Sequence, residues 1–478
     1  MPVKKKLIKE LQQAVGEDGV LFRPEELLLY EYDASSDRAA PDAVVLPRSA
    51  QDVIKIVRLA NHYEVPLVGR GAGTGLSGGA LAPQGGLLVV FSRMKRILSV
   101  DIPNLRAVVE PGLVNLDLTR AVEGDGCYFA PDPSSQKACT IGGNVAENAG
   151  GPHTLAYGVT TNHILGLEVV LPTGELVEVG SHHFDTPGYD LTGLLVGSEG
   201  TLALVTKIVV RLSRLPEAVR TLLAVFDTLD DATETVAELT ARGITPAACE
   251  LIDQFCMGAV EAATPVGLPL DAAAVLLIEL EGLQEAVEAQ GDQVEEVCRT
   301  HRAREIRRAR SDAERESLWA ARKNAFGAMG RLAPNYYVQD GVIPRTRLPQ
   351  TLRAVNEIGA RHGFRVGNIF HAGDGNLHPM ILFDARDRTQ YARVVAASNE
   401  MMKYCVEQGG SITGEHGVGM EKQNLMPLLF TDDDLGAMER VKQVFNPEGR
   451  LNPAKMFPTA KSCGELRVRP MPQSGSPP

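Results

Sequence analysis

Three histidines and a glutamate in the second half of the chain are of the types that bind metals and transfer protons. His371 ends one strand-like segment and His378 begins the next, with a glycine-rich turn between them. The hairpin that this pattern predicts brings the two imidazoles to the same end. Glu415 and His416 lie in a second tight loop that is rich in glycine. Two histidines and one carboxylate form a recurrent set of ligands for a divalent metal with an open coordination position.

The residue types leave the role of this set open. They suit Zn²⁺, Fe²⁺ or Mn²⁺ equally. Two histidines in a hairpin are also often structural groups that only make hydrogen bonds. Glu415 and His416 are adjacent, and an extended backbone would send their side chains to opposite sides. We therefore expect one of them to bind a metal while the other faces a substrate.

A second segment that predicts chemistry is Val68–Ala80, VGRGAGTGLSGGA, in which six of the eleven residues from Gly69 to Gly79 are glycine. Glycine permits positive φ and lets a bound phosphate or pyrophosphate approach the backbone N–H groups. Three of these glycines match G-x-G-x-x-G, but a Rossmann site needs a helix directly after it. Pro83 and two glycines would interrupt that helix, so strand–loop–strand is the better prediction. A flexible glycine-rich hairpin without a ligand is the alternative.

Composition limits the class of protein. The chain has 478 residues, 44% of them hydrophobic, which allows about three domains or two large ones. A net charge of -12 argues against a nucleic-acid partner. The seven cysteines form no C-x-x-C pair, which favours reduced thiols and argues against an iron–sulfur cluster in this chain. Without a signal core or a run of 18 apolar residues, we expect a cytoplasmic protein, peripheral at the inner membrane at most.

The order of the elements predicts an α+β protein of several parts. Residues 1–216 combine strand-like segments with glycine-rich loops, and 131–151, rich in small residues and prolines, predicts a loop wrapped against a ligand. In 217–415 strand-like and helical segments alternate, which favours a second sheet covered by helices. Residues 416–460 are expected to return to the first domain, and the Pro/Ser-rich tail 461–478 to be disordered.

Several segments together resemble one known family. Similarity to the FAD-binding domain of the vanillyl-alcohol oxidase/p-cresol methylhydroxylase (PCMH) superfamily is carried by VGRGAGTGLSGGA, PDPSSQKACTIGGNVAENAGG and TGLLVGSEGTLALVT. Similarity to its D-2-hydroxyacid dehydrogenase branch is carried by GNIFHAGDGNLHP, SITGEHGVGMEK and FNPEGRLNPAKMF. Within that branch, one segment most resembles the flavin subunits of bacterial glycolate oxidases, namely LWAARKNAFGAMGRLAPNYYVQDGVIPR. The resemblance implies a two-subdomain PCMH-type FAD-binding domain and a substrate or cap domain with an antiparallel sheet and helices.

The resemblance implies noncovalently held FAD, although Cys127 and Cys139 lie near flavin loops and leave a covalent link open. The residues that match the pyrophosphate cradle are Arg70, Gly71, Gly73, Thr74, Gly75, Ser77 and Gly78. Those that match the lining of the flavin and ribityl chain are Pro131, Asp132, Ser134, Ser135, Gly142, Gly143, Asn144, Gly150, Gly151 and Tyr157. Glu199 and Gly200 match the adenine end.

The resemblance also assigns the chemistry. The metal ligands of the family match His371, His378 and Glu415, and its carboxylate-binding arginine matches Arg322. It implies that His416 takes the hydroxyl proton of a D-2-hydroxy acid while hydride leaves Cα for flavin N5. A metal on that hydroxyl would lower its pKa. Without the resemblance, Arg322 reads as a solvated helix charge. For His416, the alternative to a base is a structural loop histidine.

One departure from the family bears on the substrate. Val338 and Phe326 stand where the 2-hydroxyglutarate enzymes carry a lysine and a threonine. A pocket with these two side chains lacks partners for a second carboxylate, so we expect a short monocarboxylate, glycolate or D-lactate. A 2-hydroxyglutarate dehydrogenase, a metal-dependent hydrolase and a flavin-binding assembly subunit are the alternatives. Electrons are expected to leave to an iron–sulfur subunit with a second FAD-fold subunit, or to a soluble acceptor.

Overall fold

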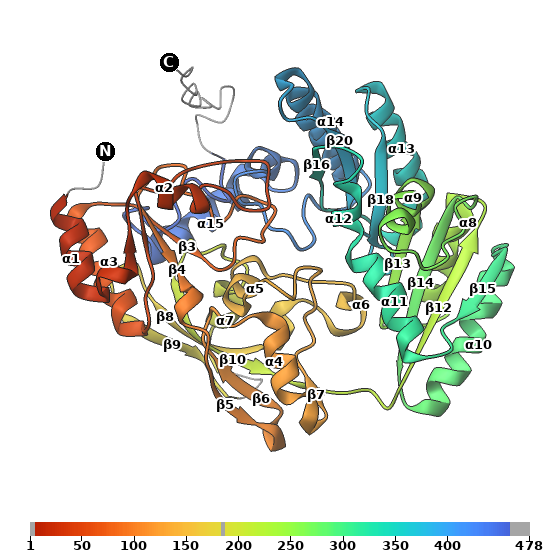
Figure 1. Ribbon diagram of the computed structural model, residues 1–478, viewed down its shortest axis with the longest axis horizontal. Coiled ribbons are helices and arrows are strands. Elements are labelled where there is room, and N and C mark those ends of the chain that lie inside the picture. Colours follow the sequence, from red (N-terminus) through yellow and green to blue (C-terminus); the bar gives the residue numbers. More distant parts are fainter. Residues whose placement is uncertain (1–4, 183–186, 459–478) are drawn as a thin grey trace, which may run out of the picture.

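Figure 1 shows the computed structural model, which describes residues 5–182 and 187–458. The expected disordered tail, 461–478, lies outside the described residues. The first half of the chain (red to yellow) builds a four-stranded and a five-stranded sheet and a two-stranded one, and the second half (green to cyan) builds one large sheet beside them. The α+β class expected from the sequence is therefore confirmed.

The first small sheet carries the glycine-rich segment. Its strand order is β1–β2–β4–β3, with bounds β1 Val20–Leu21, β2 Ala43–Val45, β3 Leu67–Arg70 and β4 Leu87–Val90. Strands β3 and β4 are parallel neighbours, so the segment between them is a crossover. The strand–loop–strand prediction is confirmed, and the hairpin alternative is wrong. Helices α1 (Lys5–Val15) and α3 (Ala50–Tyr63) pack in the same hydrophobic core, and the Ser49 hydroxyl caps α3 by accepting from Asp52 N at 3.2 Å.

The second small sheet is antiparallel, in the order β5–β6–β10–β8–β9. Its strands are β5 Ile97–Asp101, β6 Arg106–Val109, β8 Ile164–Val170, β9 Leu176–Gly180 and β10 Leu204–Arg211. The shorter elements of this half are α2 Pro24–Leu27, α4 Asn115–Val122, β7 Cys127–Tyr128, α5 Ile141–Glu147, α6 Thr154–Tyr157, α7 Leu191–Leu195 and β11 Ser213–Arg214. Strands β7 and β11 pair with each other as a two-stranded antiparallel sheet.

Helix α5 corrects the expectation that residues 131–151 form only a loop. The Thr140 hydroxyl caps it by accepting from Gly143 N at 3.2 Å, and Ile141 and Val145 are buried on one face. Asn148, in the left-handed region at φ 52°, ends it. The two glycines in its first turn hid this helix from the sequence pattern, because glycine costs about 1 kcal/mol in a helix interior.

The second half forms a nine-stranded antiparallel sheet in the order β15–β12–β14–β13–β18–β19–β17, with β16 joined to it through β20. The strands are β12 Ala218–Phe226, β13 Ala248–Asp253, β14 Ala274–Gly282, β15 Glu305–Arg308, β16 Asn335–Val338, β17 Gly341–Val342, β18 Val366–His371, β19 Asn376–Leu377 and β20 Pro379–Phe383. The helices are α8 Leu229–Ala241, α9 Gln254–Ala263, α10 Gln284–Thr300, α11 Asp312–Lys323, α12 Ala325–Met329, α13 Leu348–Arg361 and α14 Arg388–Glu407. The predicted second sheet with helices is confirmed.

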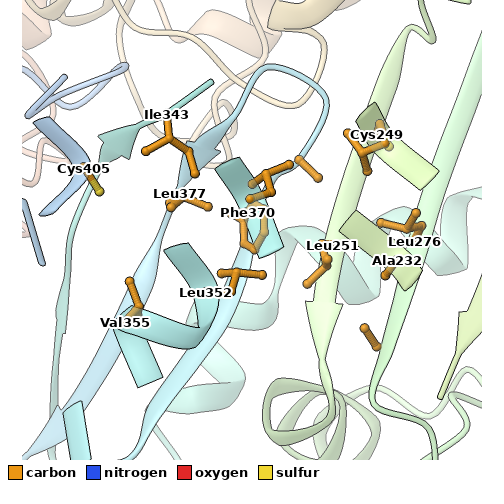
Figure 2. Packing of buried hydrophobic residues seen from close by; sticks show 14 of the residues in the cluster. Ala232, Cys249, Leu251, Leu276, Ile343, Leu352, Val355, Phe370, Leu377 and Cys405 are labelled. Atoms are coloured by element: carbon orange, nitrogen blue, oxygen red, sulfur yellow. The ribbon is translucent and has the colours of Figure 1, made fainter. Parts of the chain in front are cut away.

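Alternating side chains of this sheet enter two hydrophobic cores. Leu222 and Phe226 pack in the core formed with α8, α10, α13 and α14, whereas Leu223 packs in the core formed with α9, α11 and α12. Figure 2 shows Phe370, on β18, in the first of these cores with Leu251 of β13. Burial of such a ring contributes about 2 to 3 kcal/mol, which fixes the end of β18 where the candidate histidines begin.

The C-terminal segment lies against the first sheet, as its blue helix α15 (Asp432–Phe445) shows in Figure 1. Leu67 N donates to Arg450 O at 2.9 Å and Asn452 N donates to Leu67 O at 2.7 Å, so this segment extends the sheet beyond β3. The buried Lys455 ammonium donates to Leu81 O at 2.7 Å. Across the described ranges, no helix combines the length and apolar character needed to cross a membrane.

Candidate active site

A cavity of about 610 Å³ is lined by both halves of the chain. Its first end holds most of the predicted cofactor residues, namely Arg70, Gly71, Gly73, Thr74, Gly75, Ser134, Ser135, Gly142, Gly143, Asn144, Glu199 and Gly200. Residues from the second half also line it, namely Lys323, Phe326, Tyr336, His378, Glu415 and His416. The predicted cofactor residues that do not line it are Ser77, Gly78, Pro131, Asp132, Gly150, Gly151 and Tyr157. One cavity thus joins the glycine-rich loop to the histidines.

Unpaired buried charge marks the end of the cavity formed by the glycine-rich loop. Arg70 is 7% exposed, and its Nη1 has no hydrogen-bond partner. Gly73 has φ 71°, in the left-handed region that favours glycine, and the Arg70 guanidinium lies where a Cβ would be. An unpaired buried N–H costs about 1 to 3 kcal/mol, so this end is built to receive an acceptor such as an anionic group.

His371, His378 and Glu415 converge with their ligand atoms within 4.8 Å of one another; His378 and Glu415 line the cavity, whereas His371 does not. Glu415 Oε1 lies 3.2 Å from His371 Nε2 and 3.3 Å from His378 Nε2. The two rings cross at a centroid distance of 5.0 Å, as the predicted hairpin requires. Neither ring nitrogen of His378 makes a hydrogen bond although the residue is 2% exposed. Buried imidazoles of this kind need a partner, and a metal ion would supply one.

His416 joins the same cluster, so the expectation that its side chain diverges from Glu415 is wrong. Its ring stacks on His378 at a centroid distance of 4.9 Å, and its Nε2 lies 3.9 Å from Glu415 Oε1. The backbone here is bent, whereas side chains diverge only along an extended backbone. Burial lowers the pKa of His416 to about 4, so the imidazole is neutral at pH 7 and can accept a proton.

Asp340 causes the bend, and the sequence pattern did not identify it. Its fully buried carboxylate accepts from the backbone N–H groups of Gly414, Glu415 and His416 at 2.9 to 3.2 Å. It also accepts from Lys422 Nζ at 3.2 Å. Burial raises its pKa, but the Lys422 ammonium and His416 outweigh burial and hold that pKa well below its usual range. In the sequence, Asp340-Gly341 has the composition of an ordinary turn, so no local pattern identified Asp340 as a buried residue that positions the loop.

Glu250 positions His371 from behind the cavity. Its Oε1 lies 2.7 Å from His371 Nδ1, and its Oε2 lies 2.5 Å from Arg322 Nη2. Both Glu250 and Arg322 are fully buried, so the solvated-charge interpretation of Arg322 is wrong. Arg322 does not line the cavity; its Nη2 is ion-paired with Glu250, whereas its Nε and Nη1 have no hydrogen-bond partner. It is therefore a buried, ion-paired cation beside the cluster.

A second polar cluster joins the two halves around His153. Its Nδ1 lies 2.9 Å from Asp132 Oδ2 and its Nε2 lies 3.2 Å from Glu279 Oε1, on β14. Trp319 Nε1 donates to Glu279 at 2.6 Å. The Tyr157 hydroxyl donates to Glu281 at 2.6 Å. Asp132 and Tyr157 were predicted to line the flavin, but neither lines the cavity, and both make contacts outside it.

Replacing His153 with glutamine is expected to lower the free energy of unfolding by about 3 kcal/mol, since it removes the cation that Asp132 and Glu279 share. Burial lowers the pKa of His153, but Asp132 and Glu279 outweigh it and raise that pKa to about 10. The contribution is therefore complete below the unfolded pKa of about 6.5 and lost as pH rises through about 10. Denaturation of both proteins from pH 6 to pH 10 measures the difference. A difference that does not shrink with pH would contradict the ion pair.

Comparison with known proteins agrees with this geometry. Residues 41–180 match the family described as "FAD binding domain", and residues 215–456 match "FAD linked oxidases, C-terminal domain". The glycolate oxidase subunit GlcD of Escherichia coli K12 is 44% identical over 94% of this chain and 90% of its own length. The mitochondrial D-lactate dehydrogenase [cytochrome] of Arabidopsis thaliana is 32% identical over 95% of this chain and 81% of its own.

A solved structure supports the fold alone. Substrate-bound p-cresol methylhydroxylase superposes with a TM-score of 0.80 at 17% identity, over 94% of this chain and 96% of the other. Two family matches cover the halves that line the cavity, and FAD is the cofactor that both descriptions share. The chain therefore belongs to the family of FAD-linked oxidases and is an FAD-dependent oxidoreductase.

Proposed function

We propose that this enzyme oxidises a short 2-hydroxy acid, glycolate or D-lactate, to the 2-oxo acid. The observation that carries the proposal is the single cavity shared by the glycine-rich loop and the His378–Glu415–His416 cluster. Glycolate and D-lactate are the substrates in the names of the two relatives above. A hydrolase would use the cluster but not the glycine-rich loop.

The residues present fit both FAD and a divalent metal. Arg70 offers an unpaired donor to the FAD pyrophosphate, and His371, His378 and Glu415 would hold Zn²⁺, Fe²⁺ or Mn²⁺ through the unpaired imidazole. When bound, FAD supplies a hydride acceptor and the metal supplies positive charge at the substrate hydroxyl. The neutral imidazole of His416 then takes the hydroxyl proton.

The substrate carboxylate needs a cationic partner, and we propose Arg322 for this role. Its Nη2 is ion-paired with Glu250, on the far side of His371 from Glu415, so only its Nε and Nη1 are available to a substrate carboxylate. Charge-assisted hydrogen bonds contribute about 1.5 to 3 kcal/mol each, enough to orient a small acid.

Phe326 restricts the size of the substrate. It lines the cavity with its ring 6.3 Å from that of His378, whereas Val338 packs in the core and does not line the cavity. Replacing Phe326 with alanine is expected to raise kcat/KM for D-2-hydroxybutyrate relative to D-lactate about tenfold, since pocket space for one methylene is worth about 1 to 3 kcal/mol. Steady-state comparison of the two acids tests this, with Val338→Ala as the control. An unchanged ratio would remove Phe326 from the specificity argument.

Anaerobic titration tests the proposed reaction. The flavin spectrum should bleach with glycolate or D-lactate and stay unchanged with L-lactate. Faster bleaching by D-2-hydroxyglutarate than by either short acid would refute the size argument. Well-folded protein that stays colourless after reconstitution with FAD would refute the flavin mechanism and favour the hydrolase.

We further propose that electrons leave this chain to a partner. The six cysteines in the described ranges are free and buried, at positions scattered from Cys127 to Cys405. This arrangement offers no clustered thiolates among those residues, so an iron–sulfur centre belongs to another subunit. The Escherichia coli relative is named as a glycolate oxidase subunit, which supports a complex with other subunits. We propose that these include a second FAD-fold subunit and an iron–sulfur subunit, with peripheral membrane association through them.

A further inference from the structure

An open hollow of about 410 Å³ lies on the surface beside α12. It is lined by Ala263, Lys323, Asn324, Gly327, Ala328 and Arg331. Lys323 lines both this hollow and the large cavity, and Phe326, one residue before Gly327, lines the cavity. The junction of α11 and α12 is therefore a thin wall between solvent and the substrate end of the cavity.

The charge of the hollow differs from that of the whole chain. Its six lining residues include two cations and no acid, although the chain carries a net charge of -12. A carboxylate anion is repelled by the average surface of such a protein and attracted to a local cationic concavity. The hollow is thus electrostatically suited to collect small carboxylates.

Lys323 can exchange its contact with the Asp132 carboxylate for a contact with the carboxylate of an incoming anion. Its ammonium lies 3.1 Å from Asp132 Oδ2, and its side chain is 23% exposed. Asp132 Oδ2 also lies 2.9 Å from His153 Nδ1, so the departure of Lys323 would leave that carboxylate paired. The lysine can therefore turn toward an incoming anion without leaving a buried charge alone.

We propose that the anionic substrate reaches the cavity through this hollow, and that Lys323 is the cation that receives its carboxylate at the wall. This inference rests on the proposed function, because it assumes that a small 2-hydroxy acid is the substrate. It assigns to Lys323 a role in substrate access that is separate from proton transfer at His416.

Filling the hollow tests the route. At Gly327 the position that a Cβ would take has no neighbouring atom within 4 Å, and φ is not left-handed, so tryptophan can be accommodated in the hollow. With Gly327→Trp, the second-order rate constant for anaerobic bleaching by glycolate should fall about tenfold while the limiting rate at saturation stays within about twofold. Gly124→Trp is the matched control, since Gly124 is exposed and equally open. Flavin content and the spectrum confirm that both variants are folded.

The salt dependence of the second-order rate constant is a second, independent test of the route. Increasing ionic strength from about 0.01 to 0.1 M shortens the screening length from about 30 to 10 Å, so the wild-type constant should fall. Arg331→Gln should lower the low-salt constant about threefold and flatten this dependence. Arg440→Gln, the same charge change on exposed α15, should do neither.

The outcomes separate the two proposals. If no 2-hydroxy acid bleaches the wild type, the proposed function and the route are both wrong. If the wild type bleaches and Gly327→Trp does so with the same second-order constant, the route alone is wrong. An unchanged salt dependence in Arg331→Gln would also overturn it.

Discussion

His416→Gln is expected to slow flavin bleaching by saturating glycolate about a thousandfold, within the range of about 10² to 10⁴ that a positioned base contributes. The His416 imidazole is neutral at pH 7 because burial lowers its pKa to about 4, and its Nδ1 is buried without a partner. Glutamine can fill a similar volume but cannot accept the hydroxyl proton as a base. Anaerobic stopped-flow absorbance measures the limiting rate directly.

Two further observations decide whether the loss reflects proton transfer. With no internal base, the rate in His416→Gln should rise with pH as hydroxide replaces the imidazole. His62→Gln, the same substitution at the end of α3 and outside the cavity lining, should leave the rate unchanged. A loss below about threefold in His416→Gln would show that another group takes the proton, since a base contributes at least about 10².

Local patterns predicted the parts of the fold that local forces determine. The β18–β20 hairpin and the strand–loop–strand segment between β3 and β4 each follow from local sequence patterns. The same spacing brought His371 and His378 together, because a hairpin register of His371 with Asn376 leaves the two imidazoles at one end.

Long-range contacts explain what the sequence pattern missed. Glu250 is 121 residues from His371, and Asp340 is 76 residues from His416, so no spacing rule connects them. Arg322 read as a surface charge because helix α11 is polar on several sides, and only its packing against β13 buries it. The prediction that Glu415 and His416 diverge was wrong for the same reason, since a distant carboxylate bends their loop.

That carboxylate makes the position of the base depend on a buried ion pair. Three consecutive N–H groups, those of Gly414, Glu415 and His416, converge on Asp340. Glu415 also belongs to the proposed ligand set, so one acid places both the proposed metal ligand and the proposed base. Lys422, 1% exposed in its side chain, neutralises Asp340 within the same buried space. The positions of the two reacting groups are therefore linked to the stability of the protein.

Asp340→Asn should lower the free energy of unfolding by about 4 kcal/mol, because it leaves the Lys422 ammonium buried without its counter-charge. The double variant Asp340→Asn/Lys422→Met removes both charges and should recover most of that loss, whereas Lys422→Met alone should not. Bleaching by glycolate should nevertheless stay about a hundredfold slow in the double variant, since an amide oxygen holds the three N–H groups less strongly than a carboxylate. Denaturation of all four proteins measures the coupling, and stopped-flow absorbance measures the rate. Recovery of both stability and rate would show that Asp340 serves only to neutralise Lys422, whereas recovery of stability alone would establish it as the residue that positions the base.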